Sequence, residues 1–191
     1  MEGELVQARE VISEGGRVIF PTETAYGIAA DATNPEAIDK VYEMKRRPRS
    51  KGLTTIVSSV EQAEKFAEMD ESERSIVEEF MPGPITLVAE KKEIVPDELN
   101  EKFVFRVSSS EIARKLASDT PITATSANIS GGDTSYSVQD IDSSLREKAD
   151  FIIDEGELEN SPTSTIVEIV NGELRMHREG PIKKEQIKDS I

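Results

Sequence analysis

The stretch Lys45-Arg-Arg-Pro-Arg-Ser-Lys51 concentrates positive charge in an acidic chain. It holds five of the 23 Lys and Arg residues of a protein whose formal net charge is −15. Like charges placed so closely repel one another unless an anion lies between them. Lys and forked Arg donors suit a phosphate or a carboxylate, although a solvated basic turn or a nucleic-acid contact has the same composition. The segments on either side are needed to decide.

The basic stretch lies between a predicted helix and a predicted strand. Asn34 and Pro35 are typical of a helix start, and the apolar residues that follow share one face up to Lys45, which predicts a helix over residues 35–45. Its C-terminus therefore carries the cations, which offset the helix dipole there. Residues 17–20 predict a buried strand that ends in the hydroxyl-rich segment 21–27, which we expect to be a turn.

The remaining pattern mixes strand–helix alternation with adjacent strands, and Asn171-Gly172 is a strong hairpin signal. We therefore predict an α/β fold of the α+β type, a twisted mixed β-sheet with helices packed on it. Further strands are predicted at residues 53–57, 85–89, 103–107, 121–125, 151–153, 165–170 and 173–177. Further helices are predicted at residues 5–12, 59–67, 70–80, 110–116, 137–145 and 182–191.

Composition limits the possible classes of protein. A chain of 191 residues suits a single domain over 1–191. There is no cysteine, which excludes disulfides and thiolate sites and fits a cytoplasmic location. The only histidine, His177, makes a His-based triad or a His-rich metal site improbable on composition. No apolar window approaches the ~20 residues of a membrane span, and no secretory signal is evident.

Four hydroxyl-rich segments each lie next to a predicted strand, where ligand sites of α/β sheets collect. They are residues 21–27, 45–53, 123–131 and 164–165. If they converge, they surround one cavity with hydroxyls, an amide and two cations but without a good general base. Such a cavity suits chemistry done by positioning and charge stabilisation, for example transfer at phosphorus. Its expected residues are Thr22, Thr24, Lys45, Arg47, Ser126, Asn128 and Ser164.

Five motifs along nearly the whole chain resemble, in order, those of the YrdC-like threonylcarbamoyl-AMP synthases, in the short form with a single YrdC-like domain. Any one motif alone would be weak, whereas five in order are specific. The resemblance extends to Arg178-Glu-Gly180. The motifs are Pro21-Thr-Glu-Thr-Ala-Tyr-Gly27, Lys45-Arg-Arg-Pro48 with Lys51-Gly-Leu53, Pro82-Gly-Pro-Ile-Thr-Leu87, Ser126-Ala-Asn-Ile-Ser-Gly131 and Ser164-Thr-Ile-Val167.

This resemblance implies a YrdC-like fold with a concave basic cavity, and a nucleotidyltransferase activity. L-threonine, bicarbonate and ATP would give threonylcarbamoyl-AMP and pyrophosphate, with Mg²⁺ brought by ATP. The product would pass to a tRNA threonylcarbamoyl transferase, which modifies the adenosine next to the anticodon. The alternative is a module that binds double-stranded RNA or tRNA through residues 45–51. The low aromatic content of 5% and the negative net charge disfavour it.

The resemblance also assigns roles to residues. The family often has Asp where this chain has Glu23, so the role of that carboxylate is open. Plainer roles also exist: helix-end cations for Lys45 and Arg47, turn formers for Ser126 and Asn128, and a surface arginine for Arg178. We expect catalysis by Lys45, Arg47, Ser126 and Asn128; threonine or bicarbonate binding by Thr22, Thr24, Tyr26, Lys45, Arg47 and Thr125; ATP binding by Lys45, Arg47, Ser126, Asn128, Ser164 and Arg178; and no metal site.

Overall fold

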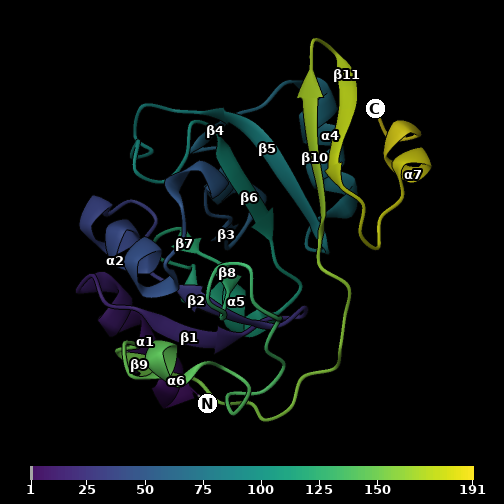
Figure 1. Cartoon of the computed structure of the whole chain (residues 1–191). Helices are drawn as coiled ribbons and strands as arrows, with labels where there is room; N and C mark the ends of the chain where they lie inside the picture. Colours follow the sequence, from purple (N-terminus) through teal and green to yellow (C-terminus); the bar gives the residue numbers. More distant parts are fainter. Residues whose placement is uncertain (1) are drawn as a thin grey trace.

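A computed structural model describes residues 2–191 of the protein, and its strands form two β-sheets (Figure 1). The strands are β1 (Val18–Pro21), β2 (Tyr26–Ala29), β3 (Thr55–Val57), β4 (Ala67–Glu68), β5 (Ile85–Lys91), β6 (Phe103–Val107), β7 (Ile122–Thr123), β8 (Thr125–Ser126), β9 (Phe151–Ile152), β10 (Thr165–Val170) and β11 (Glu173–Arg178). The helices are α1 (Glu2–Ser13), α2 (Pro35–Lys45), α3 (Val60–Ala63), α4 (Glu71–Phe80), α5 (Glu111–Leu116), α6 (Ser143–Arg146), α7 (Lys184–Lys188) and the 3₁₀ turn η1 (Arg49–Lys51).

Both sheets are mixed, which confirms the predicted fold class. In the smaller sheet, ordered β8-β2-β1-β9, β1 runs antiparallel to β2 and parallel to β9. In the larger sheet, ordered β11-β10-β5-β6-β3-β7 with β4 on β5, strand β5 is antiparallel to β6 and parallel to β10. The smaller sheet lies below the larger one in Figure 1, and the chain crosses between them several times.

One crossing corrects the prediction of a single strand over residues 121–125. The chain forms β7 on the larger sheet and β8 on the smaller sheet, with Ala124 between them. The backbone N–H of Ala124 donates to the carbonyl of Thr54 at 2.7 Å instead of continuing either ladder. This switch brings Ser126 beside Gly27 of β2, so two of the predicted motifs become neighbours.

The expected turn over residues 21–27 was partly wrong, because it contains the end of β1 and the start of β2. Pro21 pairs with Tyr26 in the antiparallel register and so continues the strand that it was expected to end. Residues 22–25 form the connection between the strands. All four residues of Tyr26–Ala29 are buried, which explains why a strand forms in spite of the polar residues before it.

Three predicted helices are shorter than expected. The helix from Ser59 ends at Ala63, and Ala67 belongs to β4. Ser137 and Asp140 bond to each other's backbone N–H at 3.2 and 3.3 Å, which closes a turn, and the helix starts only at Ser143. The C-terminal helix covers Lys184–Lys188. Local hydrogen bonds of Ser and Asp compete with helix formation in this way.

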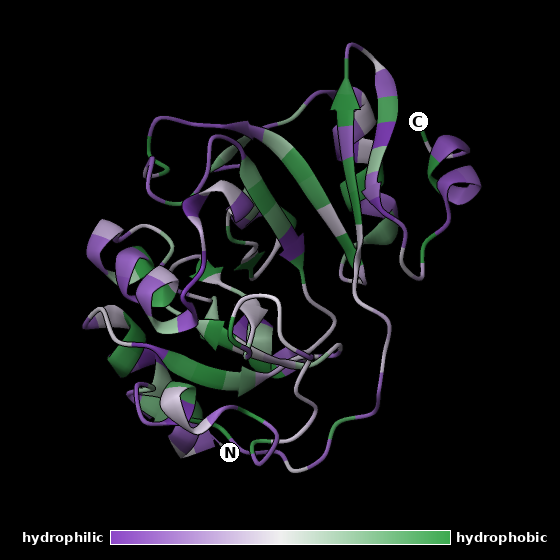
Figure 2. Ribbon diagram, in the orientation of Figure 1, coloured by the Kyte–Doolittle hydropathy of each residue, from purple (hydrophilic) through white to green (hydrophobic). Residues whose placement is uncertain are grey.

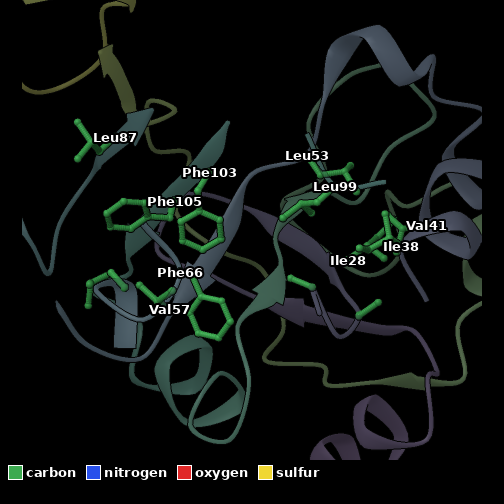
Figure 3. Packing of buried hydrophobic residues seen from close by; sticks show 14 of the residues in the cluster. Ile28, Ile38, Val41, Leu53, Val57, Phe66, Leu87, Leu99, Phe103 and Phe105 are labelled. Atoms are coloured by element: carbon green, nitrogen blue, oxygen red, sulfur yellow. The ribbon is translucent and has the colours of Figure 1, made fainter. Parts of the chain in front are cut away.

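Helix α2 follows its prediction. Asn34 caps it by accepting from the N–H groups of Glu36 and Ala37, and its buried face includes Ile38, Val41 and Lys45. Figure 3 shows Ile38 and Val41 against Ile28 of β2. Each such buried aliphatic side chain contributes about 1.5–3 kcal/mol, so α2 is held firmly against the smaller sheet.

A second part of the core lies on the larger sheet. The ring of Phe103 stacks on Phe66 and on Phe105, with centroids 5.9 and 5.3 Å apart (Figure 3). Figure 2 shows that the β10–β11 hairpin instead alternates hydrophobic and hydrophilic residues, while α7 is mostly hydrophilic. Among residues 2–191, no helix combines the length and apolar character needed to cross a membrane.

Candidate active site

A cavity of about 270 Å³ is lined by residues from both sheets and from the loops between them. Its walls come from the β1–β2 connection, the β7–β8 switch, β6, β11 and the segment before β10. The lining residues are Thr22, Thr24, Ala25, Tyr26, Gly27, Arg47, Thr54, Arg106, Ala124, Thr125, Ser126, Thr134, Thr163, Ser164 and Arg178.

Two predicted arginines line this cavity with their charge unneutralised. Arg47 donates from Nε to the carbonyl of Gly52 at 2.7 Å and from Nη2 to that of Lys51 at 3.0 Å. Arg178 donates to the carbonyl and the hydroxyl of Ser164, at 2.9 and 3.2 Å. Burial lowers the pKa of both guanidinium groups. Because neutral oxygens fix both side chains, the cavity keeps their positive charge for an anion.

Arg106 is a third cavity arginine, and the sequence analysis did not single it out. It was assigned only to a strand, although a charge inside Phe-Val-Phe-Arg-Val is an available signal, because buried charges are rare unless they are paired. Its Nη1 donates to Glu23 Oε1, and the other oxygen of Glu23 accepts from Ser108 Oγ. Burial and the nearby Arg178 lower the pKa of Arg106 to about 10. The carboxylate of Glu23 therefore has a defined partner.

Lys45 is buried and is not among the residues that line the cavity. It is 0% exposed, and its Nζ donates to the Ser126 carbonyl, to the Asn128 carbonyl at 2.7 Å and to Asn128 Oδ1 at 3.1 Å. Burial and the adjacent Arg47 lower the pKa of Lys45 to about 7. An ammonium group has three donors, and all three serve the 126–128 turn here.

The turn held by Lys45 presents one of its two predicted residues to the cavity. Ser126 lines the cavity and donates from Oγ to Asn128 Oδ1 at 2.8 Å. Asn128 is not a lining residue, and its Nδ2 donates to the carbonyl of Gly132 at 2.6 Å. Asn128 therefore orients Ser126 and closes the following loop.

Four predicted hydroxyl residues, Thr22, Thr24, Thr125 and Ser164, also line the cavity. Thr22 Oγ1 lies 3.1 Å from Thr24 Oγ1 and donates to the carbonyl of Ala25 at 2.7 Å. Ser164 Oγ lies 2.9 Å from the buried hydroxyl of Thr86. The sequence analysis did not single out three further threonines of the lining, Thr54, Thr134 and Thr163, although Thr54 and Thr163 directly adjoin the predicted segments 45–53 and 164–165.

Tyr26 contributes to the cavity wall, while its hydroxyl bonds away into the protein. The hydroxyl donates to the carbonyl of Gly156 at 2.9 Å and accepts from the N–H of Glu155 at 3.0 Å. Burial raises its pKa. These contacts tie down the extended segment that leads to Thr163 and Ser164.

Gly180 ends the segment Arg178-Glu-Gly180, and its surroundings leave no room for a side chain. A Cβ at this position would lie 2.4 Å from the carbonyl oxygen of Thr163 and 2.7 Å from the N–H of Thr165. Only glycine allows so close a backbone approach. The approach presses the Ser164 segment against the strand that carries Arg178.

A more open groove of about 730 Å³ adjoins the cavity and shares Arg47, Thr54 and Arg178 with it. Lys51 and Lys102 add cations to its lining. Arg49, which also lines it, pairs with Asp39 and lies 4.3 Å over the ring of Tyr42. His177 of the groove bonds to Glu168 at 2.7 Å.

The donor set of the cavity suits anions better than metal ions. Its polar lining consists of guanidinium groups and hydroxyls, whereas Mg²⁺ prefers carboxylate and water oxygens. Within the part of the chain described, no group of three or more His, Cys, Asp or Glu could hold a metal ion. This arrangement can bind several negative charges and orient a hydroxyl-bearing molecule between them.

Comparison with known proteins gives a consistent result. The Sua5/YciO/YrdC family model, which carries the description telomere recombination, matches residues 10–180. A protein of Methanocaldococcus jannaschii is 38% identical over 179 residues, covering 92% of this chain and 86% of the relative. The threonylcarbamoyl-AMP synthases of Pyrococcus abyssi and Bacillus subtilis are 36% and 30% identical, and this chain spans only 55% and 56% of their lengths.

Solved structures agree with the sequence comparison. The P. abyssi Sua5 structure complexed with L-threonine superposes with a TM-score of 0.93 at 35% identity, covering 100% of this chain and 58% of that one. The structure of Escherichia coli YciO, at 21% identity and a TM-score of 0.86, shares the fold. The likeness therefore extends over the whole described chain.

Proposed function

Because the chain belongs to the Sua5/YciO/YrdC family, we propose that it is a threonylcarbamoyl-AMP synthase. Its substrates are L-threonine, bicarbonate and ATP, and its products are threonylcarbamoyl-AMP, pyrophosphate and water. The names of the P. abyssi and B. subtilis relatives support this activity, as does the L-threonine complex of the P. abyssi protein. The same names support an enzyme over the RNA-binding module.

The observation that carries the proposal is that three arginines and a set of hydroxyls line one cavity. Arg47 and Arg178 suit the phosphates of ATP, since each keeps its charge and a forked set of donors. The hydroxyls of Thr22, Thr24 and Thr125 suit the small polar amino acid. A cavity of about 270 Å³ together with the adjoining groove of about 730 Å³ is the space proposed for ATP, L-threonine and bicarbonate.

The reaction needs two bonds to form. The threonine nitrogen bonds to the carbon of bicarbonate with loss of water, and a carbamate oxygen then bonds to the α-phosphorus of ATP. The bond from that phosphorus to the β-phosphate bridging oxygen breaks, and pyrophosphate leaves. Negative charge grows on the leaving phosphates, where fixed guanidinium groups stabilise it without reorganising. Ser126 Oγ lines the cavity and already donates its hydrogen to Asn128 Oδ1, so it can accept a hydrogen bond from a donor group of a substrate.

We propose that Mg²⁺ enters with ATP and is held mainly by phosphate oxygens and water. The carboxylate of Glu23 contacts Arg106 of the lining, but both of its oxygens already accept hydrogen bonds, one from Arg106 and one from Ser108. The cavity therefore offers the metal no protein ligand set of its own, and its residues act on the phosphates and on the amino acid.

The further partners follow from the product. Threonylcarbamoyl-AMP is a mixed anhydride, so a transferase that carries the threonylcarbamoyl group to tRNA must consume it quickly. We propose such a transferase as the partner and the cytoplasm as the location. Contact with RNA through the cations at 45–51 is not required by this proposal, and the charge of Arg49 is already paired with Asp39.

The test is product identification. The purified protein is incubated with ATP, L-threonine and ¹³C-labelled bicarbonate, and mass spectrometry should find threonylcarbamoyl-AMP that carries the label. Omitting any one substrate should abolish pyrophosphate release. RNA binding with a steep salt dependence, and no binding of ATP or threonine in calorimetry, would instead support the RNA-binding module.

A further inference from the structure

Glu23 lies in the β1–β2 connection, between the two threonines that line the cavity, yet it is not a lining residue itself. The chain bends here, with the N–H of Thr22 donating to the carbonyl of Ala25 at 3.0 Å, and the two threonine hydroxyls lie 3.1 Å apart. The carboxylate reaches Arg106 and Ser108, which belong to β6 and the residues just after it. Because β1 and β2 belong to the smaller sheet and β6 to the larger one, this contact joins the two sheets beside the cavity.

The ion pair is well buried. The side chain of Arg106 is 6% exposed and that of Glu23 is 19% exposed. One N–H of the guanidinium serves Glu23, and a guanidinium has five such donors. The remaining donors of Arg106 have no hydrogen-bond acceptor among the described residues, and Arg106 lines the cavity. One edge of the group is thus held by protein and the rest remains available to a ligand.

The three cavity arginines therefore differ in local charge. Within residues 2–191, Arg47 and Arg178 bond to carbonyl and hydroxyl oxygens, whereas Arg106 is paired with a carboxylate. A paired arginine is locally close to neutral, and its attraction for an anion depends on direction more than on net charge. Such a group suits a singly charged carboxylate, while the two unpaired arginines suit the several charges of a triphosphate.

From this difference we infer that Glu23 is a positioning residue that orients Arg106 toward a small carboxylate, namely that of the amino-acid substrate. Ser108 assists by holding the second oxygen of Glu23, so that the carboxylate cannot rotate away. The inference rests on the proposed function and assigns different ligand groups to the arginines of its site: Arg47 and Arg178 to the triphosphate, and Arg106 to the amino-acid carboxylate. It also answers the question raised by the Glu at position 23, since this side chain reaches across to the neighbouring sheet.

The experiment compares Glu23→Gln, Glu23→Asp and Ser108→Ala with the unmodified protein. Glu23→Gln keeps the size of the side chain and removes its charge, and Glu23→Asp keeps the charge with a shorter reach. Asp150→Asn is the matched control, because Asp150 also pairs with an arginine, Arg17, at a place outside the cavity. Pyrophosphate release gives KM for L-threonine and for ATP separately, and thermal unfolding reports folding.

We expect Glu23→Gln to raise KM for L-threonine by about tenfold or more, the size of losing one charge-assisted hydrogen bond, while KM for ATP changes less than threefold. Glu23→Asp should recover part of the loss, Ser108→Ala should show a smaller loss, and Asp150→Asn should leave both KM values unchanged. A parallel rise in both KM values, or an unchanged KM for threonine, would overturn the inference.

Failure of the proposed function can be told apart from failure of this inference. If the unmodified protein makes product while Glu23→Gln binds threonine normally, only the positioning role is wrong. If no product forms, calorimetric binding of L-threonine decides: weaker binding by Glu23→Gln supports the role, and equal binding or no binding by the unmodified protein overturns it. If Glu23→Gln does not fold, Ser108→Ala is judged by the same measurements.

Discussion

Replacing Lys45 with Met should change how the stability of the protein depends on pH. Lys45 is fully buried, and its folded-state pKa is about 7, against the ordinary value of 10.5. In the unfolded chain the amine keeps its proton up to the ordinary value, so between these limits the unfolded state binds more protons. The free energy of unfolding therefore rises with pH in this window. From pH 6 to pH 9 the Lys45 contribution is roughly 2–3 kcal/mol.

The methionine side chain has a similar shape and no titrating group, so Lys45→Met should lose this pH-dependent part. It also leaves three acceptors without their donor, the carbonyls of Ser126 and Asn128 and Asn128 Oδ1. Each unsatisfied buried acceptor costs about 1–3 kcal/mol, independently of pH. The variant should therefore be less stable than the unmodified protein by a margin that grows from pH 6 to pH 9.

The assay is urea unfolding of the two proteins at pH 6, 7, 8 and 9, with the difference in unfolding free energy plotted against pH. All other titrating groups are shared and cancel in that difference. Lys51→Met is the control, because Lys51 is an exposed lysine of the same stretch, and its difference plot should be flat. A flat plot for Lys45→Met would show that Lys45 does not lose its proton near neutral pH, and the reasoning from burial would be wrong.

Three further predictions concern the reaction. Arg47→Ala should lower pyrophosphate release by about 10²–10³-fold, because a fixed charge on the phosphates is lost, and should change the unfolding free energy by under about 1 kcal/mol. The control is Arg9→Ala, since Arg9 pairs with Asp119 and does not line the cavity, and it should match the unmodified protein. Near-normal release by Arg47→Ala would remove Arg47 from the site. Pyrophosphate release should be poor with valine, which leaves hydroxyl-binding groups unpaired, and serine should be rejected less strongly, by about 10–200-fold; equal turnover of valine and threonine would refute the polar pocket. Pyrophosphate release should require added Mg²⁺, while elemental analysis of the protein after dialysis against a chelator should find no stoichiometric metal. A metal that the protein retains would contradict the proposal that Mg²⁺ binds together with ATP.

Interactions between residues close in sequence were predicted well. Asn34 caps α2, Asp70 and Glu73 form the capping box of α4, and Asn171-Gly172 turns the β10–β11 hairpin. These devices depend on hydrogen bonds across two to four residues, so the local sequence contains all the information they need. The order of the motifs likewise indicated the family before any geometry was known.

That Thr22 and Thr24 are hydroxyl residues of one ligand-binding segment was predicted from the sequence, and both line the cavity. The lengths of the short strands and helices were not predicted. Residues 121–125 divide between two sheets, and residues 137–142 form turns, since hydrogen bonds to distant partners or to neighbouring side chains replace the expected ladder.

The sequence by itself determined the family resemblance, the mixed α/β class and the set of hydroxyl and cationic motifs. Tertiary structure alone decided which cations line the cavity. Lys45 bonds to Asn128 and Arg106 bonds to Glu23 across 83 residues of chain in each case. Local sequence preferences act over a few residues and cannot predict contacts at such separations, because only the packing of the two sheets brings these partners together. In the folded protein, buried Lys45 bonds to the 126–128 turn and does not line the cavity, whereas Arg106 lines the cavity and is paired with Glu23.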